Sequence, residues 1–260
     1  MYPRELPKSA HAPGIVSDKQ RMPEQTIRPI SRIWINRLTA AGIPTDGTVM
    51  EVAPGRESKI GTALAALGFT GTIVLIEPDR NAAAAVQEIY RQIVPRAKVM
   101  LVRKQLQHVE VGIDIPTSID ALVANHVFDD MVMSCILGHP SCPRDEPYPL
   151  LTPIDYSQGT KATVSGWKTA IETVAPASLI VSQYPVRILS QPGFEARQNS
   201  GFEVLDQLKI LYSRYASESD CQGGSHYRDD PQWREDPRWW LIAMFRPMAD
   251  MEAQYAALLP

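Results

Sequence analysis

The segment from Thr48 to Asp79 constrains the fold more than any other part of the chain. It opens with an apolar run, Thr48 to Val52, and then breaks at Ala-Pro-Gly, where Gly55 permits a sharp turn and close approach of the backbone to a ligand. Apolar residues recur at helical spacing from Ile60 to Leu67. The short β-branched run from Thr72 to Ile76 is typical of a buried parallel strand. This order of strand, turn, helix and strand predicts a βαβ unit.

An acidic residue follows the second strand of this unit directly. The sequence after Ile76 is Glu77-Pro78-Asp79. A carboxylate at the tip of the second strand can accept hydrogen bonds from both ribose hydroxyls of a nucleotide that lies across the first turn. The segment therefore predicts a nucleotide site, with Glu77 as the group that binds the sugar.

Composition sets broad bounds on the function. The chain has 260 residues, of which 44% are hydrophobic and 21% charged, which is typical of one well-buried α/β core with added loops. A net charge of −3 gives no broad electrostatic attraction for nucleic acid. The sequence contains no apolar stretch near the roughly 20 residues that cross a bilayer, and no signal-like amino terminus. We expect a cytoplasmic protein that binds neither nucleic acid nor membranes.

The rest of the chain continues the alternation of helices and strands. An extended arm reaches to about Gln25, and two irregular segments, 138–159 and 213–238, interrupt the pattern. The first of these, rich in proline, has the profile of a binding loop that selects the substrate. The predicted helices are Thr26–Ala41, Asn81–Val94, His126–Leu137, Lys161–Val174 and Phe202–Leu208, and the further strands are Lys98–Val102, Asp120–Ala124, Ser178–Ser182, Lys209–Tyr212 and Trp239–Phe245.

Four motifs, taken in order, resemble the class I S-adenosylmethionine-dependent methyltransferases. Glu51-Val-Ala-Pro-Gly55 is similar to their first motif, and Ile76-Glu-Pro-Asp79 to their ribose-binding motif. The run from Ile119 to Asp130 resembles their fourth-strand motif, and Arg238 to Phe245 their antiparallel seventh strand. The resemblance covers roughly Thr48 to Arg246. It implies an α/β fold, a three-layer Rossmann-like sandwich of about seven strands with an antiparallel last strand, plus an N-terminal helical segment.

The departures from the family pattern also carry information. Ala53 stands where the family usually has its first glycine, and Glu57 stands where the third would be. A pyrophosphate would be repelled by Glu57 and needs glycine at the turn, so a dinucleotide is disfavoured more than S-adenosylmethionine, which has no phosphate. After the third strand the chain continues as Arg103-Lys104-Gln105, without the acidic residue often found there, so the adenine contact stays unassigned.

The resemblance implies a cofactor site around S-adenosyl-L-methionine. Glu77 would bind the ribose, the first turn would line the methionine part, and Glu51 would reach the amino group directly or through water. Asn125 would bind the substrate or the cofactor's amino group. The cofactor-binding residues expected on this basis are Glu51, Ala53, Pro54, Gly55, Glu77, Pro78, Asn125 and His126.

Candidate catalytic residues lie at the end of the fourth strand and in the loop that follows. His126 could act as a general base with an ordinary pKa near 6.5, or could only cap the following helix. Asp129 and Asp130 lie one turn into that helix, so at most one can face the site, and Asp129 is the candidate. His139 is a third candidate, from the loop. After the fifth strand the chain has Gln183 and Tyr184 in place of acidic ligands, so we predict no catalytic metal.

These expectations define three regions and one function. Residues 1–45 are expected to form an arm and a helix, and this helix either covers the site or packs outside the sheet. Residues 46–248 would form the methyltransferase domain, and residues 249–260 a tail. The function expected is methyl transfer to an oxygen, nitrogen or sulfur of a small molecule. Alternatives are transfer of the cofactor's aminobutyrate or aminopropyl arm, a nicotinamide-dependent reductase, which should have an intact GxGxxG, and a non-catalytic binding or interaction module. The apolar helix Thr26–Ala41 would also suit a homodimer interface.

Overall fold

The structure is a computed structural model that describes residues 24–56, 58–137, 153–183, 199–208 and 241–245. In chain order the elements are α1 (Glu24–Ala40), β1 (Thr48–Val52), α2 (Lys59–Ala66), β2 (Thr72–Ile76), α3 (Arg80–Ile93), β3 (Lys98–Val102), η1 (Leu106–His108), β4 (Ala121–Asn125), α4 (Phe128–Leu137), α5 (Pro153–Val174), β5 (Leu179–Gln183) and β6 (Leu241–Phe245). Residues 199–208 form a further helix.

The described strands form one sheet in the order β3-β2-β1-β4-β5-β6. The first five run parallel, and β6 pairs antiparallel with β5. After β1 the chain builds outward through β2 and β3 on one side, and then returns to build β4 and β5 on the other. The boundary between β1 and β4 is therefore a topological switch point, and in open α/β sheets ligands bind at the carboxyl ends of the strands at this point.

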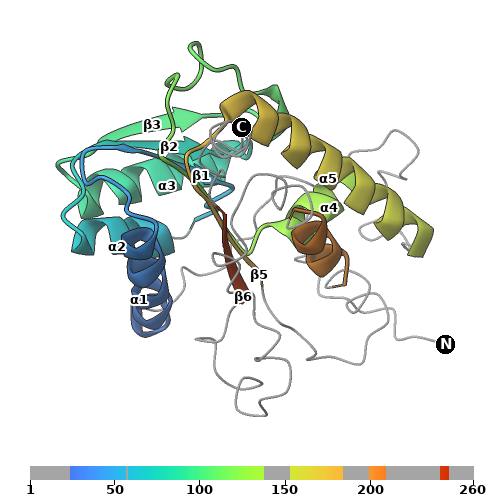
Figure 1. The fold of residues 1–260 in the computed structure, drawn as a ribbon, viewed down its shortest axis with the longest axis horizontal. Helices are drawn as coiled ribbons and strands as arrows, with labels where there is room; N and C mark the ends of the chain where they lie inside the picture. The colour runs from blue at the N-terminus through green and yellow to red at the C-terminus, as the bar shows by residue number, and fades with distance from the viewer. Residues whose placement is uncertain (1–23, 57, 138–152, 184–198, 209–240, 246–260) are drawn as a thin grey trace, which may run out of the picture.

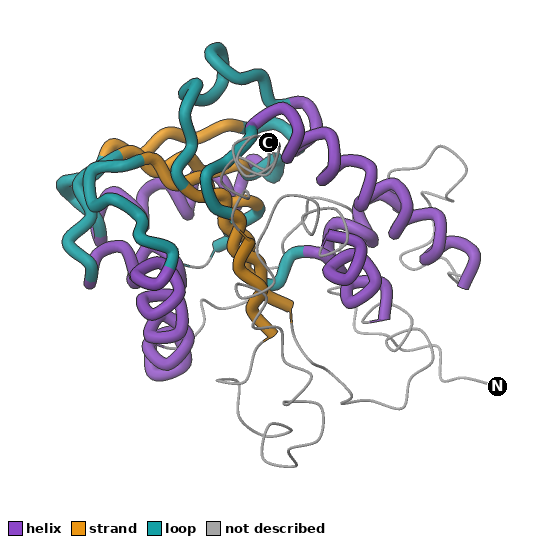
Figure 2. The backbone as a smooth tube through the Cα atoms, in the orientation of Figure 1, coloured by secondary structure: helices purple, strands orange, loops and turns teal. Residues whose placement is uncertain are grey.

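Helices cover both faces of the sheet (Figure 1). The strands alternate, so that Val49 of β1 joins the apolar cluster under α1, α2 and α3, whereas Met50 joins the cluster under α4, α5 and helix 199–208. Figure 2 shows the strands between these two groups of helices. The α/β three-layer arrangement predicted from the sequence is present.

Helix α1 packs on the outside of the sheet beside α2. Ile30, Trp34 and Leu38 follow each other at intervals of one helical turn and are at most 1% exposed. The Ser31 hydroxyl donates to the Lys59 carbonyl at 2.9 Å, which ties α1 to the start of α2. The apolar face that these three residues form is thus buried within the protomer.

Two predicted boundaries are wrong for identifiable reasons. Helix α5 begins at Pro153, so the loop predicted over 138–159 includes seven helical residues; proline is well tolerated in a first helical turn. Within α5, a Cβ at Gly159 would lie 2.6 Å from Ile136, so glycine lets α5 approach α4 and does not mark a loop. Helix α4 begins at Phe128 and not at His126, which has a left-handed backbone (φ +59°).

Some predictions fall outside the described residues. They include the amino-terminal arm up to residue 23, residues 138–152 of the first predicted loop, the strand predicted at 209–212, the loop 213–238 and the tail from 249. Of the helices in the described ranges, none combines the length and the apolar character that crossing a membrane requires.

Candidate cofactor site at the switch point

The turn after β1 holds two residues in a left-handed conformation. Ala53 has φ +48° and Gly55 has φ +64°. The Ala53 amide donates to the Ile76 carbonyl at 2.8 Å, which fixes the turn against the end of β2. An alanine in this conformation costs about 1–2 kcal/mol, so position 53 keeps a backbone that glycine would adopt freely. Among the residues that the structure describes, a Cβ at Gly55 would meet nothing within 4 Å, so none of them fills the space that this turn faces.

The carboxylate of Glu77 contacts this turn. Its Oε2 accepts a hydrogen bond from the Gly55 amide at 3.0 Å, and its Oε1 accepts one from the Asp79 amide at 3.0 Å. Each carboxylate oxygen has capacity for a further donor. Residues 22 apart in the chain are thereby joined, and the acidic tip of β2 lies over the first turn as the sequence predicts.

Glu77 is only 4% exposed, and burial raises its pKa. The two backbone hydrogen bonds oppose this rise, whereas the negative charges of Asp79 and Asp130 add to it. The influence of Asp130 shows that the first turn of α4 lies close enough to Glu77 to affect its charge. The carboxylate at the tip of β2 and the acidic first turn of α4 therefore lie within electrostatic range of each other across the switch point.

Glu51 lies in a buried hydrogen-bond chain that joins β1, α2 and α3. The Tyr90 hydroxyl donates to the Glu51 carboxylate, and accepts from the Gly61 amide at 2.9 Å. Glu51 is 3% exposed, and burial raises its pKa to about 8, against the lowering influence of the Tyr90 hydrogen bond and the charge of Lys59. Glu51 therefore holds a proton at neutral pH in the protein without a bound cation.

Asn125 marks the end of β4, on the other side of the switch point. Its Oδ1 accepts hydrogen bonds from the Trp34 indole at 3.0 Å and from the Ser182 hydroxyl at 3.1 Å. Because the indole nitrogen can only donate, the atom it meets must be the oxygen, and this fixes the orientation of the amide. The Asn125 NH₂ group has no hydrogen-bond partner in the described part of the chain, and is available to a ligand.

Two of the predicted catalytic residues follow β4: His126 lies directly after the strand, and Asp129 lies in the first turn of α4. The His126 amide donates to the Ser182 carbonyl at 2.9 Å, so the histidine backbone is fixed to β5. Asp129 is 2% exposed, whereas Asp130 is exposed. This division agrees with the prediction that only one of the two aspartates faces inward.

Backbone strain concentrates at the switch point. Only three non-glycine residues in the described ranges have positive φ. Two of them lie at the switch point: Ala53 directly follows β1, and His126 directly follows β4. Val52 pairs with Ala124, so these two turns leave the sheet side by side. Strained backbone of this kind gathers at functional sites, where the surrounding structure maintains it.

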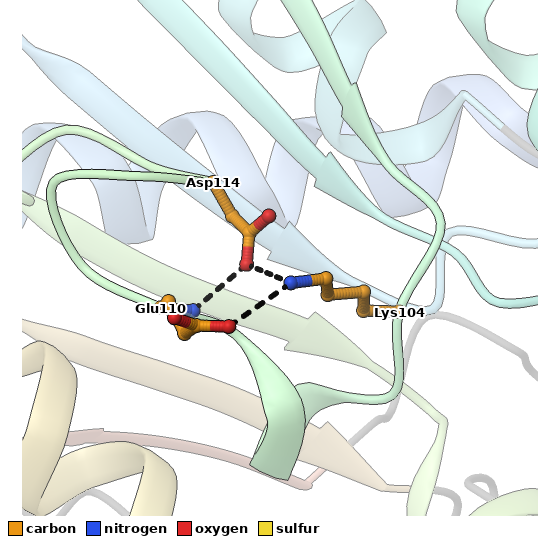
Figure 3. A network of polar contacts seen from close by, with 3 residues as sticks. All are labelled: Lys104, Glu110 and Asp114. Carbon is orange, nitrogen blue, oxygen red and sulfur yellow. Dashed lines mark hydrogen bonds and ion pairs between the residues drawn. The ribbon is translucent and has the colours of Figure 1, made fainter.

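The loop after β3 lies at the same edge of the sheet, beyond Glu77. Lys104 binds Asp114 at 2.7 Å and Glu110 at 3.4 Å, and Asp114 also accepts from the Glu110 amide at 2.9 Å (Figure 3). These contacts are exposed and stabilise the fold little by themselves. They join the two ends of the loop 104–114, which follows β3 at the position where the family often has an acidic residue.

The structure brings together most of the predicted site residues. Glu77 and Gly55 are in contact, and the Ala53 amide is hydrogen-bonded to the end of β2. Asn125 ends β4, and His126 directly follows it. Pro54 is buried and Pro78 exposed, so these two frame the turns without offering polar groups. His139 lies outside the described residues.

Sequence reasoning missed three residues that shape the site. Trp34 and Tyr90 lie in helices that the sequence predicts, but nothing local marks them as site residues, because an indole or phenol partner far away in the chain leaves no local pattern. Gln183 was considered only as a missing metal ligand. In the described ranges no three side chains of His, Cys, Asp or Glu are grouped as metal ligands would be.

Comparison with known proteins gives matches in structure only. No protein-family model matches the chain, and no curated protein sequence matches it. Similar solved structures include the bifunctional kinase-methyltransferase WbdD, with 13% identity and a TM-score of 0.47 over 87% of this chain and 40% of that chain. The plantazolicin methyltransferase BpumL in complex with SAH has 6% identity and a TM-score of 0.47 over 87% of this chain and 86% of its own. A SAM-dependent methyltransferase from Aquifex aeolicus has 14% identity and a TM-score of 0.42 over 74% of this chain and 88% of its own.

These proteins are similar to the chain only distantly, and this chain spans less than half the length of WbdD. At such identities and TM-scores, function has to be argued from the geometry of the site itself.

Proposed function

We propose that the chain is an S-adenosylmethionine-dependent methyltransferase that acts on an oxygen, nitrogen or sulfur of a small molecule. The observation that carries this proposal is the contact between the Glu77 carboxylate and the Gly55 amide at the switch point of the sheet. It sets an acidic group from the tip of β2 over an open turn after β1, which is the arrangement a ribose needs.

The charges of the site favour this cofactor over a dinucleotide. The negative charge of Asp130 acts on Glu77 across the site. A pyrophosphate would be repelled by these carboxyl groups, whereas the positive sulfonium of S-adenosylmethionine would be attracted. When bound, this cofactor supplies an electrophilic methyl group.

Different residues of the site would bind different parts of the cofactor. Glu77 would accept hydrogen bonds from the ribose hydroxyls, and the backbone of Ala53 and Gly55 would line the methionine part. Glu51 would receive the ammonium group, and would have to release its proton to do so because its pKa is about 8. The Asn125 NH₂ group would donate to the cofactor or to the acceptor.

On the acceptor side, His126 is the proposed general base and Asp129 its neighbour in the first turn of α4. Methyl transfer needs little from the protein beyond holding a nucleophile in line and removing its proton. A small acceptor is favoured over nucleic acid because the net charge is −3 and the site itself is acidic.

Thermal denaturation with three ligands that contain adenosine tests this function. S-adenosylhomocysteine should raise the Tm as its concentration exceeds the Kd, and NAD⁺ and ATP should not. If NAD⁺ stabilised the protein and S-adenosylhomocysteine did not, the proposal would be wrong. With S-adenosylmethionine and a set of amines, phenols and thiols, a product heavier by one methyl group supports methyl transfer. A product carrying the aminobutyrate or aminopropyl arm would contradict it, as would tight binding without any turnover.

A further inference from the structure

The most unusual polar side chain in the described structure is Gln183, the last residue of β5. It is 0% exposed, and neither its Nε2 nor its Oε1 has a hydrogen-bond partner in the described part of the chain. Buried carboxamides almost always have partners, because leaving both groups unpaired is strongly unfavourable. An unpaired group of this kind therefore requires a reason.

The position of Gln183 connects it with the candidate site. Ser182, its neighbour in β5, pairs with Asn125 in the sheet and bonds its side chain, so Gln183 ends the strand beside β4 at the same edge. It continues the face that carries Leu179 and Val181, which is the face covered by α4 and helix 199–208. The carboxamide thus lies under the start of α4.

Gly201 of helix 199–208 allows the helix to approach this carboxamide. A Cβ at Gly201 would lie 2.4 Å from the Gln183 Nε2, and 3.5 Å from the Asp129 amide nitrogen. The glycine, the carboxamide and the first turn of α4 therefore surround one point. Any larger residue at position 201 would displace Gln183.

We propose that Gln183 is the recognition group of an acceptor subsite for an uncharged group of the amide type, which offers one hydrogen-bond donor and one acceptor. A carboxamide can satisfy such a group with two parallel hydrogen bonds, since it has the complementary acceptor and donor. An anionic group is disfavoured there, because Asp129, whose backbone amide lies 3.5 Å from where a Cβ at Gly201 would lie, is an acidic residue only 2% exposed. The term acceptor rests on the proposed function, whereas the chemistry of the ligand does not.

If Gln183 serves binding, its unpaired carboxamide should lower the stability of the protein without ligands. Gln183→Met keeps the size of the side chain and removes both unpaired groups, so in the absence of ligands its Tm should be a few degrees above that of the wild type. Gln92→Met, which removes an exposed carboxamide and its 2.9 Å hydrogen bond to Glu88, is the control and should not raise the Tm. A lower Tm for Gln183→Met would show that Gln183 is a structural residue, and would overturn the proposal.

Acetamide and acetate, which have the same shape and differ in charge, test the ligand class. The side-chain NH₂ signals of Gln183, identified in ¹⁵N NMR spectra by their loss in Gln183→Met, should shift saturably with acetamide, and acetate should bind at least tenfold more weakly. Gly201→Ala should abolish the response to acetamide. No saturable shift, or equal affinity for acetate, would contradict the proposal.

The same titrations are repeated with saturating S-adenosylhomocysteine, whose affinity is expected to be equal in the wild type and Gln183→Met. Failure of the wild type to bind this nucleoside would remove the proposed function but leave the acetamide result standing. Failure of the acetamide response in a protein that binds the nucleoside would remove the subsite alone.

Discussion

At the scale of single residues, two buried glutamates at the ends of neighbouring strands have different surroundings. Glu77 accepts two backbone hydrogen bonds, and these oppose the effect of burial on its pKa. Glu51 has one side-chain donor, Tyr90, and burial raises its pKa to about 8. Glu77 is therefore suited to accept hydrogen bonds from a sugar, whereas Glu51 can exchange its proton for a bound cation.

The raised pKa of Glu51 predicts that the folded protein loses stability as pH rises. A glutamate in the unfolded chain ionises near 4.5, but Glu51 in the folded protein ionises near about 8. Between these values the folded state holds a proton that the unfolded state has released. The stabilisation is therefore complete below pH about 4.5 and is lost progressively as pH approaches 8, at up to about 1.4 kcal/mol per pH unit.

Glu51→Gln tests this, because glutamine keeps an acceptor for Tyr90 and cannot ionise. Urea denaturation at pH 5.5, 7.0 and 8.5 should show the variant gaining stability relative to the wild type at each step, because only the wild type loses the contribution of Glu51 as pH rises. Glu77 also has a raised pKa and contributes in the same direction to both proteins, so the difference between them isolates Glu51. Parallel stability profiles would contradict the assignment.

At the scale of elements, the start of α3 links a helix cap with the site. The Asp79 carboxylate accepts from the Ala82 amide at 2.7 Å and caps the helix, and the Asp79 amide donates to Glu77. The same residue therefore begins α3 and orients the proposed ribose-binding carboxylate.

Asp79→Ala should lower the free energy of unfolding by about 1 kcal/mol, because the cap is lost. Asp79→Asn retains a capping oxygen, and should be destabilised by less. Chemical denaturation of both variants at pH 7 measures the difference. If the alanine and asparagine variants were equally stable, the side chain of Asp79 would not be acting as a cap.

Most elements could be predicted from local patterns. β2 and β3 begin and end where the sequence predicts, because short apolar β-branched runs bounded by turns have few other solutions. The start of α5 could not be predicted, because the prolines and Gly159 near it are typical of a loop. The close contact of Gly159 with Ile136 of α4, which explains the glycine, is visible only in the structure. Local sequence also gives no sign of strain at Ala53 and His126, because glycine is the residue that usually marks positive φ.

At the scale of the whole molecule, the order of the strands determines where the site lies. β1 and β4 are adjacent in the sheet although β4 begins at Ala121, 69 positions after Val52 at the end of β1, and their turns meet at the switch point. The sequence predicts this meeting through motif order, since each half of the site follows a strand. It could not predict the buried partners, such as Trp34 on Asn125, that hold the two halves in place.

The central claim is that a sulfonium nucleoside binds over the first turn through Glu77, and calorimetric titration with S-adenosylhomocysteine tests it most directly. Glu77→Gln keeps the size of the side chain but removes its charge and one acceptor, and Glu88→Gln makes the same change on the exposed face of α3. We expect the wild type and Glu88→Gln to bind with equal affinity, and Glu77→Gln to bind at least about tenfold more weakly. Absence of binding by the wild type, or equal affinity of Glu77→Gln, would contradict the account.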